Sequence, residues 1–128
     1  MLRSIKHTLH PKRLTKSFLC ALDGLVHILK SHHNARLIFF FAISAVILGV
    51  CLKVSIEEML IVLLTIGMVF ISEVFNTMVE DITNLITDKQ FHPVVKVIKD
   101  MAAGAVLVAS IISFIIGYFI FLKRIWRI

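Results

Sequence analysis

The residues from Met101 to Leu122 limit how this chain can fold more than any other feature of its sequence. Over these 22 residues the only ionisable side chain is the phenol of Tyr118. A helix needs about 20 predominantly apolar residues to cross the hydrocarbon core of a bilayer, and this run meets that length by itself. A soluble chain of 128 residues has too small an interior to hide such a segment. The run therefore predicts an integral membrane protein.

Two further apolar runs predict two more membrane spans. Residues 37–52 are uncharged, and Arg36 and Lys53 at their ends can extend the run to the membrane interface. Residues 59–80 begin with apolar side chains as far as Ile71. The composition agrees, since 59% of the residues are hydrophobic and only 17% are charged, against about a quarter in soluble domains. We expect an all-α chain forming one membrane domain over residues 1–128, with spans at 37–52, 59–80 and 101–122.

The N-terminal region, residues 1–36, is basic and predicts an amphipathic helix ahead of the first span. Pro11 suits a helix start, and apolar side chains follow at steps of three and four residues, which is the helical period. These apolar residues are Leu14, Phe18, Leu22, Leu25, Ile28 and Leu29. A basic amphipathic helix in this place favours a position in the headgroup region. The alternative is a soluble helix packed on a partner.

The charged residues are unevenly distributed and predict the orientation of the chain. Fourteen Lys and Arg against eight Asp and Glu give a net charge of +6. Such an excess suits nucleic acids or an anionic membrane, and the hydrophobicity favours the membrane, with no nucleic-acid partner. With the N-terminus inside, residues 1–36 and a cytoplasmic loop at 81–100 hold ten of the basic residues, and the outer segments hold four. The positive-inside rule therefore favours a multi-pass protein with a cytoplasmic N-terminus.

The second span carries polar residues on one helical face. At 100° per residue, Asn76 lies about 60° from Glu73, while Glu80 and Asn84 each lie about 20° from it, on opposite sides. Such a stripe cannot face lipid, so it lines an interface or an aqueous pocket. The alternative is that these carboxylates merely end the span. That explains Glu80 well but not Glu73, because apolar residues continue on both sides of it.

A carboxylate at membrane depth is costly and marks a functional site by default. Glu73 could carry protons, bind an ion or act as the general base for a lipid substrate. Glu80 could hold Mg²⁺, which takes one or two carboxylates together with substrate phosphates. Lys99 and the basic helix could hold phosphates as point charges. A general base, a metal ion and positive charges that hold the phosphates are together the components of phosphoryl transfer. The nucleotide-binding loop GxxxxGK[ST] is not present.

Two motifs in this region resemble those of a known family. Residues 73–80 read EVFNTMVE and resemble the E-x-x-N-[ST]-x-x-E signature of the small bacterial lipid kinases, which include diacylglycerol kinase and undecaprenol kinase. Residues 91–93, FHP, and 97–106, VIKDMAAGAV, resemble the family's second signature. The resemblance covers about residues 12–122, and the order of the spans matches. Two separated motifs in one topology make a specific signal.

The resemblance implies a fold, a reaction and a location. The fold would be a homotrimer of three-span subunits with active sites between subunits at the cytoplasmic face of the bacterial plasma membrane. The reaction would be phosphorylation of a membrane lipid alcohol by ATP with Mg²⁺. Undecaprenol is the favoured lipid and diacylglycerol is next, because the second motif is more similar to the undecaprenol kinase branch.

The resemblance also implies roles for individual residues. Glu73 would be the catalytic base that takes the proton from the lipid hydroxyl. The residues expected to bind the nucleotide are Arg13, Glu80, Gln90, Phe91, His92, Lys99 and Asp100. The residues expected to bind the lipid are Lys16, Arg36, Glu73 and Asn76. Glu80 and His32 are the expected metal ligands.

Three positions differ from the family pattern, and one of them is Cys20, near a position that often carries an aromatic group beside the nucleotide. His32 stands where the family has a metal-binding Glu, and Asn84 stands where it usually has Asp. Imidazole suits Zn, Cu or Fe better than Mg²⁺. Two further hypotheses stay open, and these differences motivate the first of them. One is a weakened or inactive homologue that keeps the trimeric fold and binds nucleotide, and the other is a small ion carrier.

Overall fold

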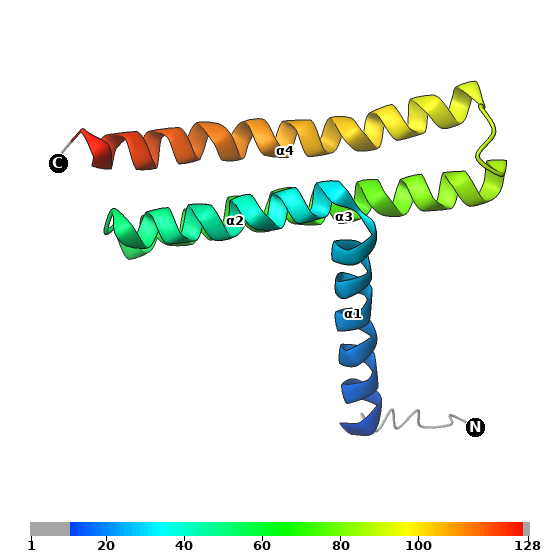
Figure 1. The fold of residues 1–128 in the computed structure, drawn as a ribbon, viewed down its shortest axis with the longest axis horizontal. Coiled ribbons are helices and arrows are strands. Elements are labelled where there is room, and N and C mark those ends of the chain that lie inside the picture. The colour runs from blue at the N-terminus through cyan, green and yellow to red at the C-terminus, as the bar shows by residue number, and fades with distance from the viewer. Residues whose placement is uncertain (1–10, 127–128) are drawn as a thin grey trace, which may run out of the picture.

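A computed structural model describes residues 11–126 of the chain. The first ten residues of the basic N-terminal region and the last two residues of the chain lie outside the described part. The helices are α1 (Pro11–Ser31), α2 (His33–Cys51), α3 (Ile56–Thr87) and α4 (Pro93–Ile125) (Figure 1). Residues 11–126 contain no strand. The last three helices are each long and apolar enough to cross a membrane, which confirms the predicted all-α fold with three spanning helices.

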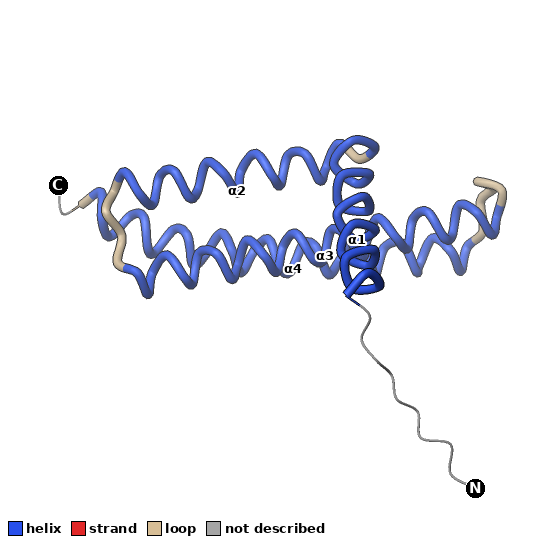
Figure 2. The backbone as a smooth tube through the Cα atoms, turned by 90° about the horizontal axis from the view of Figure 1, so that it is seen from below, coloured by secondary structure: helices blue, strands red, loops and turns tan. Residues whose placement is uncertain are grey.

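The three spanning helices run side by side, and α1 runs across them instead of continuing their direction (Figures 1 and 2). The 19 residues of α2 make a helix about 28 Å long, close to the roughly 30 Å of the hydrocarbon core. The 32 residues of α3 make a helix about 48 Å long. Because the helices are level at the other end (Figure 1), α3 and α4 project about 20 Å beyond the start of α2, and we call this part the projecting end.

The helices extend beyond the predicted spans, into the segment 81–100 that the sequence predicts as a cytoplasmic loop. Only residues 88–92 of that segment lie outside helices. The prediction ended the spans where the bilayer length was filled, yet a helix continues into water until a residue stops it. No Gly or Pro occurs between 81 and 92. The helix α3 ends at Asp88 in a left-handed conformation with φ of 49°, and Pro93 then begins α4 at a position that suits proline.

The chain buries polar side chains and exposes apolar ones, which is the reverse of a soluble globule. In the described part the buried apolar residues are Ala35, Val62, Ala109 and Ile120. The buried polar residues are Thr65, Glu73, Asn76, Thr77 and Thr83. Large apolar side chains such as Phe41, Leu64 and Phe114 are more than half exposed. This distribution suits helices whose outer surface meets lipid or other helices.

An ion pair joins α3 to α4 at the end of the bundle farthest from the projecting end. Ser55 and Glu58 form a capping box at the start of α3, which satisfies free backbone N–H groups of the first turn. The same Glu58 carboxylate accepts a hydrogen bond of 2.8 Å from the Arg124 guanidinium near the end of α4. This contact fixes the register of α3 against α4 at the far side of the molecule.

Gly49 lies where α2 closely approaches the start of α3. A Cβ at this position would come within 2.6 Å of Met59 Cε. Because this atom is the end of a flexible side chain, we expect Gly49→Ala to fold but to lower stability by about 1 kcal/mol. Gly67→Ala is the matched control, since its Cβ would meet nothing within 4 Å. Thermal unfolding in one detergent measures both variants, and equal melting temperatures would contradict this close approach.

Candidate active site

The polar face of α3 is centred on the buried carboxylate of Glu73. The side chain of Glu73 is only 4% exposed, and those of Asn76 and Thr77 are 7% and 3% exposed. One and two turns further along, Asn84 is half-buried and Glu80 is exposed. The face thus passes from a buried position at Glu73 to an exposed position at Glu80, over residues at the predicted helical spacing.

The junction between α1 and α2 supplies the polar neighbours of Glu73. The polar residues around the Glu73 carboxylate are Asn34, His32 and Glu80. His32 is the single residue that separates α1 from α2. Because α2 has 19 residues and ends level with the start of α3, the start of α2 lies beside the part of α3 about 19 residues along, where Glu73 is. Glu73 therefore lies at the base of the projecting end.

His32 contacts α3 through the residue that follows Glu80. Its Nε2 lies 3.7 Å from Oδ2 of Asp81, and their side chains are 24% and 59% exposed. No group of three or more His, Cys, Asp or Glu side chains that could hold a metal ion occurs among residues 11–126. The pair of metal ligands expected from the sequence, Glu80 and His32, therefore does not form a complete metal cage with other side chains of one chain.

The start of α4 brings Lys99 to the same face of α3. Lys99 Nζ donates a hydrogen bond of 2.7 Å to Oδ1 of Asn84. Asp100, the next residue, is exposed and forms an ion pair with Lys96 along the surface of α4. Both Lys99 and Asp100 were expected in a loop but lie in α4, where the second turn passes into the third. The interaction between Lys99 and Asn84 depends on the two helices being long, so the sequence did not predict it.

The other expected site residues fall into two groups. Gln90, Phe91 and His92 form the exposed turn between α3 and α4, at the projecting end with Lys99. Arg13 and Lys16 lie exposed in the first turns of α1, about 25 Å along that helix from His32. A single chain therefore does not bring them to Glu73. Arg36 lies at the α1–α2 junction, where its guanidinium donates a hydrogen bond of 2.9 Å to the backbone oxygen of Lys30.

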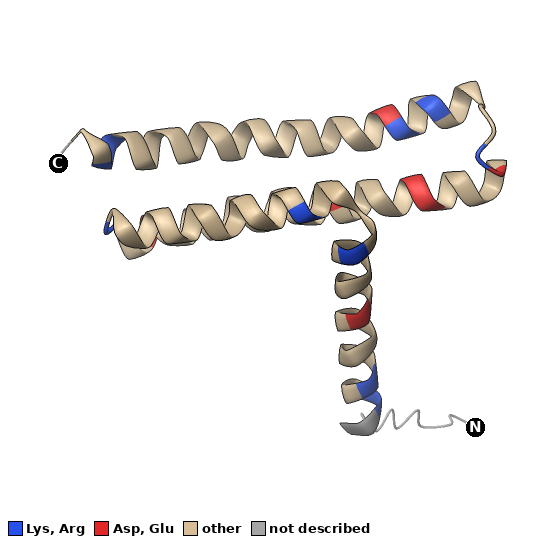
Figure 3. Ribbon diagram, viewed as in Figure 1, with Lys and Arg blue, Asp and Glu red and all other residues tan. Residues whose placement is uncertain are grey.

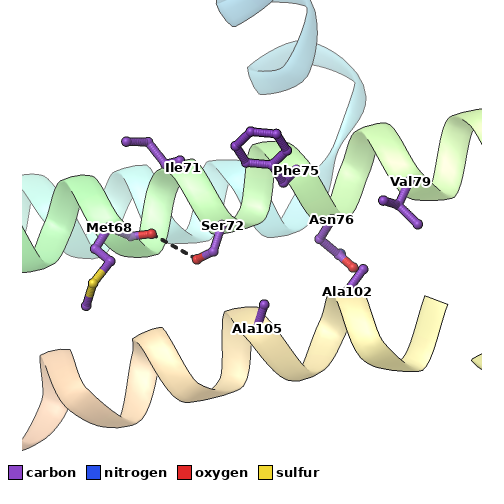
Figure 4. A pocket seen from close by; sticks show the side chains of 8 residues that line it. All are labelled: Met68, Ile71, Ser72, Phe75, Asn76, Val79, Ala102 and Ala105. Atoms are coloured by element: carbon purple, nitrogen blue, oxygen red, sulfur yellow. Dashed lines mark hydrogen bonds between the residues drawn. The ribbon is translucent and has the colours of Figure 1, made fainter. Parts of the chain in front are cut away.

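An apolar groove between α3 and α4 begins beside the buried stripe. It has a volume of about 470 Å³, and Asn76 points across it towards Ala102 of α4 (Figure 4). The Oδ1 atom of Asn76 is buried and accepts no hydrogen bond from any of residues 11–126. The residues that line the groove are Met68, Ile71, Ser72, Phe75, Asn76, Val79, Ala102 and Ala105. The sequence analysis did not predict this groove. The sequence feature that could have indicated it is the run of small residues in α4.

Charge is concentrated away from the apolar middle of the bundle. Figure 3 shows charged residues near the α3–α4 turn and along α1, whereas the middle of α4 has none. The projecting end thus places lysines beside carboxylates outside the predicted hydrocarbon core. Such a surface can hold an anionic ligand such as a phosphate chain.

Comparisons with known proteins identify the family of this chain. Residues 19–121 match the family described as prokaryotic diacylglycerol kinase. The chain is 41% identical over 113 residues to an undecaprenol kinase of Bacillus subtilis, and the match covers 88% of this chain and 91% of that protein. It is 31% identical over 104 residues to a diacylglycerol kinase of Synechocystis, covering 81% of this chain and 59% of that protein. Because these matches extend over all three spanning helices, the chain belongs to the prokaryotic diacylglycerol kinase family, the lipid kinases of bacterial membranes.

Proposed function

We propose that this protein transfers the γ-phosphoryl group of ATP to a membrane lipid alcohol, with undecaprenol as the favoured substrate and diacylglycerol as the next. The observation that carries the proposal is the Glu73 carboxylate, which is 4% exposed and lies level with the start of α2, where the projecting end begins. The relative with 41% identity, an undecaprenol kinase, supports the choice of lipid. A lipid hydroxyl reaches this depth from the membrane, while a nucleotide reaches it from water.

Glu73 acts as the general base in the proposed reaction. Its carboxylate accepts the proton of the lipid hydroxyl, and the hydroxyl oxygen forms a bond to the γ-phosphorus of ATP. The bond between the γ-phosphorus and the bridging oxygen breaks, so ADP leaves and the lipid phosphate remains in the membrane. Burial of Glu73 keeps water from competing with the lipid for the phosphoryl group. The neighbouring Asn76 orients the reacting hydroxyl from the groove.

The residues at the projecting end fit a nucleotide that arrives with Mg²⁺. Mg²⁺ commonly uses only one or two protein carboxylates and takes its other ligands from phosphates and water. The exposed Glu80 supplies one such carboxylate, so no closed protein cage is required. When bound, the ion neutralises charge on the β- and γ-phosphates. Lys99 contacts the phosphates, and the turn residues Gln90, Phe91 and His92 lie beside the nucleotide.

We propose that the projecting end faces the cytoplasm and that the chain works as a homotrimer. The excess of basic residues in the N-terminal region and around the α3–α4 turn supports this orientation. The separation of Arg13 and Lys16 from Glu73 within one chain supports an assembly in which α1 reaches a site on a neighbour. There Arg13 would hold the nucleotide, and Lys16 and Arg36 would hold the lipid.

A second candidate function is a weakened homologue that binds nucleotide but turns over slowly. The observation that favours it is His32, an imidazole 3.7 Å from Asp81, at the position where a carboxylate would strengthen Mg²⁺ binding. If this histidine limits the activity, His32→Glu raises the Mg²⁺-dependent rate several-fold, because Mg²⁺ prefers oxygen ligands. His33→Glu is the matched control. The test is the rate of lipid phosphorylation measured over a series of Mg²⁺ concentrations. Equal rates for native protein and both variants argue against a limit set by His32.

The proposed reaction is tested by supplying γ-labelled ATP to purified protein in lipid nanodiscs that contain either undecaprenol or diacylglycerol. We expect label in both lipids with Mg²⁺ present, and faster labelling of undecaprenol. Faster labelling of diacylglycerol reverses the substrate assignment but keeps the reaction. If neither lipid is labelled with any of Mg²⁺, Mn²⁺ and Zn²⁺, the kinase proposal is overturned.

A further inference from the structure

A second groove lies between α2, α3 and α4 in the spanning part of the bundle, and we call it the three-helix groove. Its volume is about 410 Å³, which is within the usual range for ligand pockets. It is separate from the groove beside Asn76, which we call the α3–α4 groove, because no residue lines both of them. The protein therefore offers two grooves into which the hydrocarbon part of a lipid could extend.

The α3 wall of the three-helix groove lies on the helix face that carries Glu73. At 100° per residue, Val69 lies about 40° from Glu73 and Ile66 about 20° from it, one and two turns further from the projecting end. The α3 residues that line the α3–α4 groove lie between about 60° and 160° from Glu73. The face of Glu73 therefore leads into the three-helix groove and passes beside the other one.

The α2 wall shows the same continuity. Asn34, one of the polar residues around Glu73, stands in the first turn of α2. Ile38 lies about 40° from Asn34 around the helix, and Phe41 and Ala45 each lie about 20° from it. The polar residues around Glu73 are thus followed, along both helices and away from the projecting end, by the mainly apolar walls of the groove.

Small side chains on opposite walls keep the groove open. Two hydrogen bonds between α3 and α4 set the antiparallel register of these helices, and this register puts Ser113 of α4 level with Val69. Ser113 and Ala45 both line the groove, and both are half-buried. A larger side chain at either position would therefore occupy part of the space between α2 and α4.

We propose that the three-helix groove holds the hydrocarbon chain of the lipid alcohol, and that the small side chains of Ala45 and Ser113 determine which chains it accepts. This inference rests on the proposed kinase function, because the chain is placed by the hydroxyl that reacts at Glu73. The chain extends away from the projecting end, since charged residues lie there (Figure 3). One groove of this size suits one chain, which favours a polyprenol over a lipid with two acyl chains.

The first test uses native full-length protein in nanodiscs and a polyprenol that carries a photoreactive diazirine in its second isoprene unit. We expect a covalent adduct on residues 38–45 of α2, and we expect unlabelled undecaprenol to compete for it. These residues distinguish the two grooves because α2 does not line the α3–α4 groove. Competed adducts confined to residues 68–79 and 102–105, or no competed adduct, would overturn the proposal.

The second test measures the KM for undecaprenol and the KM for ATP in variants. Ala45→Leu is expected to raise the KM for undecaprenol about tenfold and to leave the KM for ATP unchanged, because the added carbon atoms take the place of the lipid chain. Ser44→Leu is the matched control, since Ser44 is exposed on the same helix and lies outside the groove. Ala105→Leu fills the α3–α4 groove instead and should raise the KM for undecaprenol less than Ala45→Leu does.

The extra volume in Ala45→Leu could prevent folding, because overpacking destabilises a core. Thermal unfolding shows whether the variant is folded. If it is not, Ser113→Leu carries the same prediction from the α4 wall, and the photoreactive lipid tests the groove without any substitution.

The outcomes separate failure of this inference from failure of the proposed function. Native protein that phosphorylates no lipid overturns both. Native protein that phosphorylates undecaprenol, with a KM for this lipid that rises more in Ala105→Leu than in Ala45→Leu, overturns only the choice of groove. A native KM for undecaprenol in both Ala45→Leu and Ser113→Leu overturns the role of the small side chains. A raised KM for undecaprenol in these variants, with native values in Ser44→Leu, supports the proposal.

Discussion

Replacing Glu73 by Gln is expected to lower the kcat for lipid phosphorylation by about a thousandfold, because a positioned general base contributes on the order of 10² to 10⁴ to the rate. Gln has nearly the same shape as Glu, so it fits the buried position, where the native side chain is 4% exposed. It cannot accept the hydroxyl proton as a carboxylate does. The KM for ATP should change little, because Glu73 does not contact the phosphates in the proposed complex.

The matched control for this variant is Glu57→Gln, near the start of the same helix. Glu57 is exposed and lies about 24 Å from Glu73 along α3. The kcat of the Glu57→Gln variant should therefore equal that of the native protein. The rates are measured with saturating ATP and lipid in nanodiscs. A Glu73→Gln variant that keeps more than about a tenth of the native kcat is incompatible with a role as general base.

Replacing Glu80 by Gln is expected to raise the Mg²⁺ concentration for half-maximal activity and to lower kcat/KM for ATP by about a hundredfold. Mg²⁺ held by one or two carboxylates loses much of its protein-derived charge when one is removed, and the ion contributes several kcal/mol to stabilising a phosphoryl-transfer transition state. Glu80 is exposed, so the substitution should leave the folded structure intact. The measurement is the initial rate as a function of Mg²⁺ at fixed ATP and lipid.

Asp88→Asn is the matched control for Glu80→Gln. Asp88 is an exposed carboxylate that ends α3 with φ of 49°, a left-handed conformation that Asn adopts as readily as Asp. Its removal also deletes one negative charge from the projecting end. If Asp88→Asn alters the Mg²⁺ dependence as much as Glu80→Gln, general electrostatics explains the effect, and a metal ligand at Glu80 is contradicted.

The elements that the sequence predicted well are those set by hydrophobic periodicity. The uncharged run that ends at Leu122 fixed the third span, and the spacing of Glu73, Asn76 and Glu80 placed them on one face of α3. Both inferences need only the geometry of a helix and the cost of placing charge in hydrocarbon. The structure buries Glu73 and Asn76 and exposes Glu80.

The features that the sequence did not predict depend on contacts between helices. The bilayer criterion gives the length of a span but not where a helix ends in water, so Lys99 was expected in a loop although it lies in α4. Its hydrogen bond to Asn84 and the groove beside Asn76 both require α3 and α4 to be placed against each other. Periodicity within one helix carries no information on that placement.

The most direct test of the central claim follows transfer of labelled γ-phosphate from ATP to undecaprenol in nanodiscs, for native protein and Glu73→Gln side by side. We predict labelled undecaprenyl phosphate from the native protein and at most about a thousandth of that rate from the variant. Nucleotide binding should be the same for both proteins. Equal rates of labelling by the two proteins would contradict the assignment of Glu73 as the base in a lipid kinase.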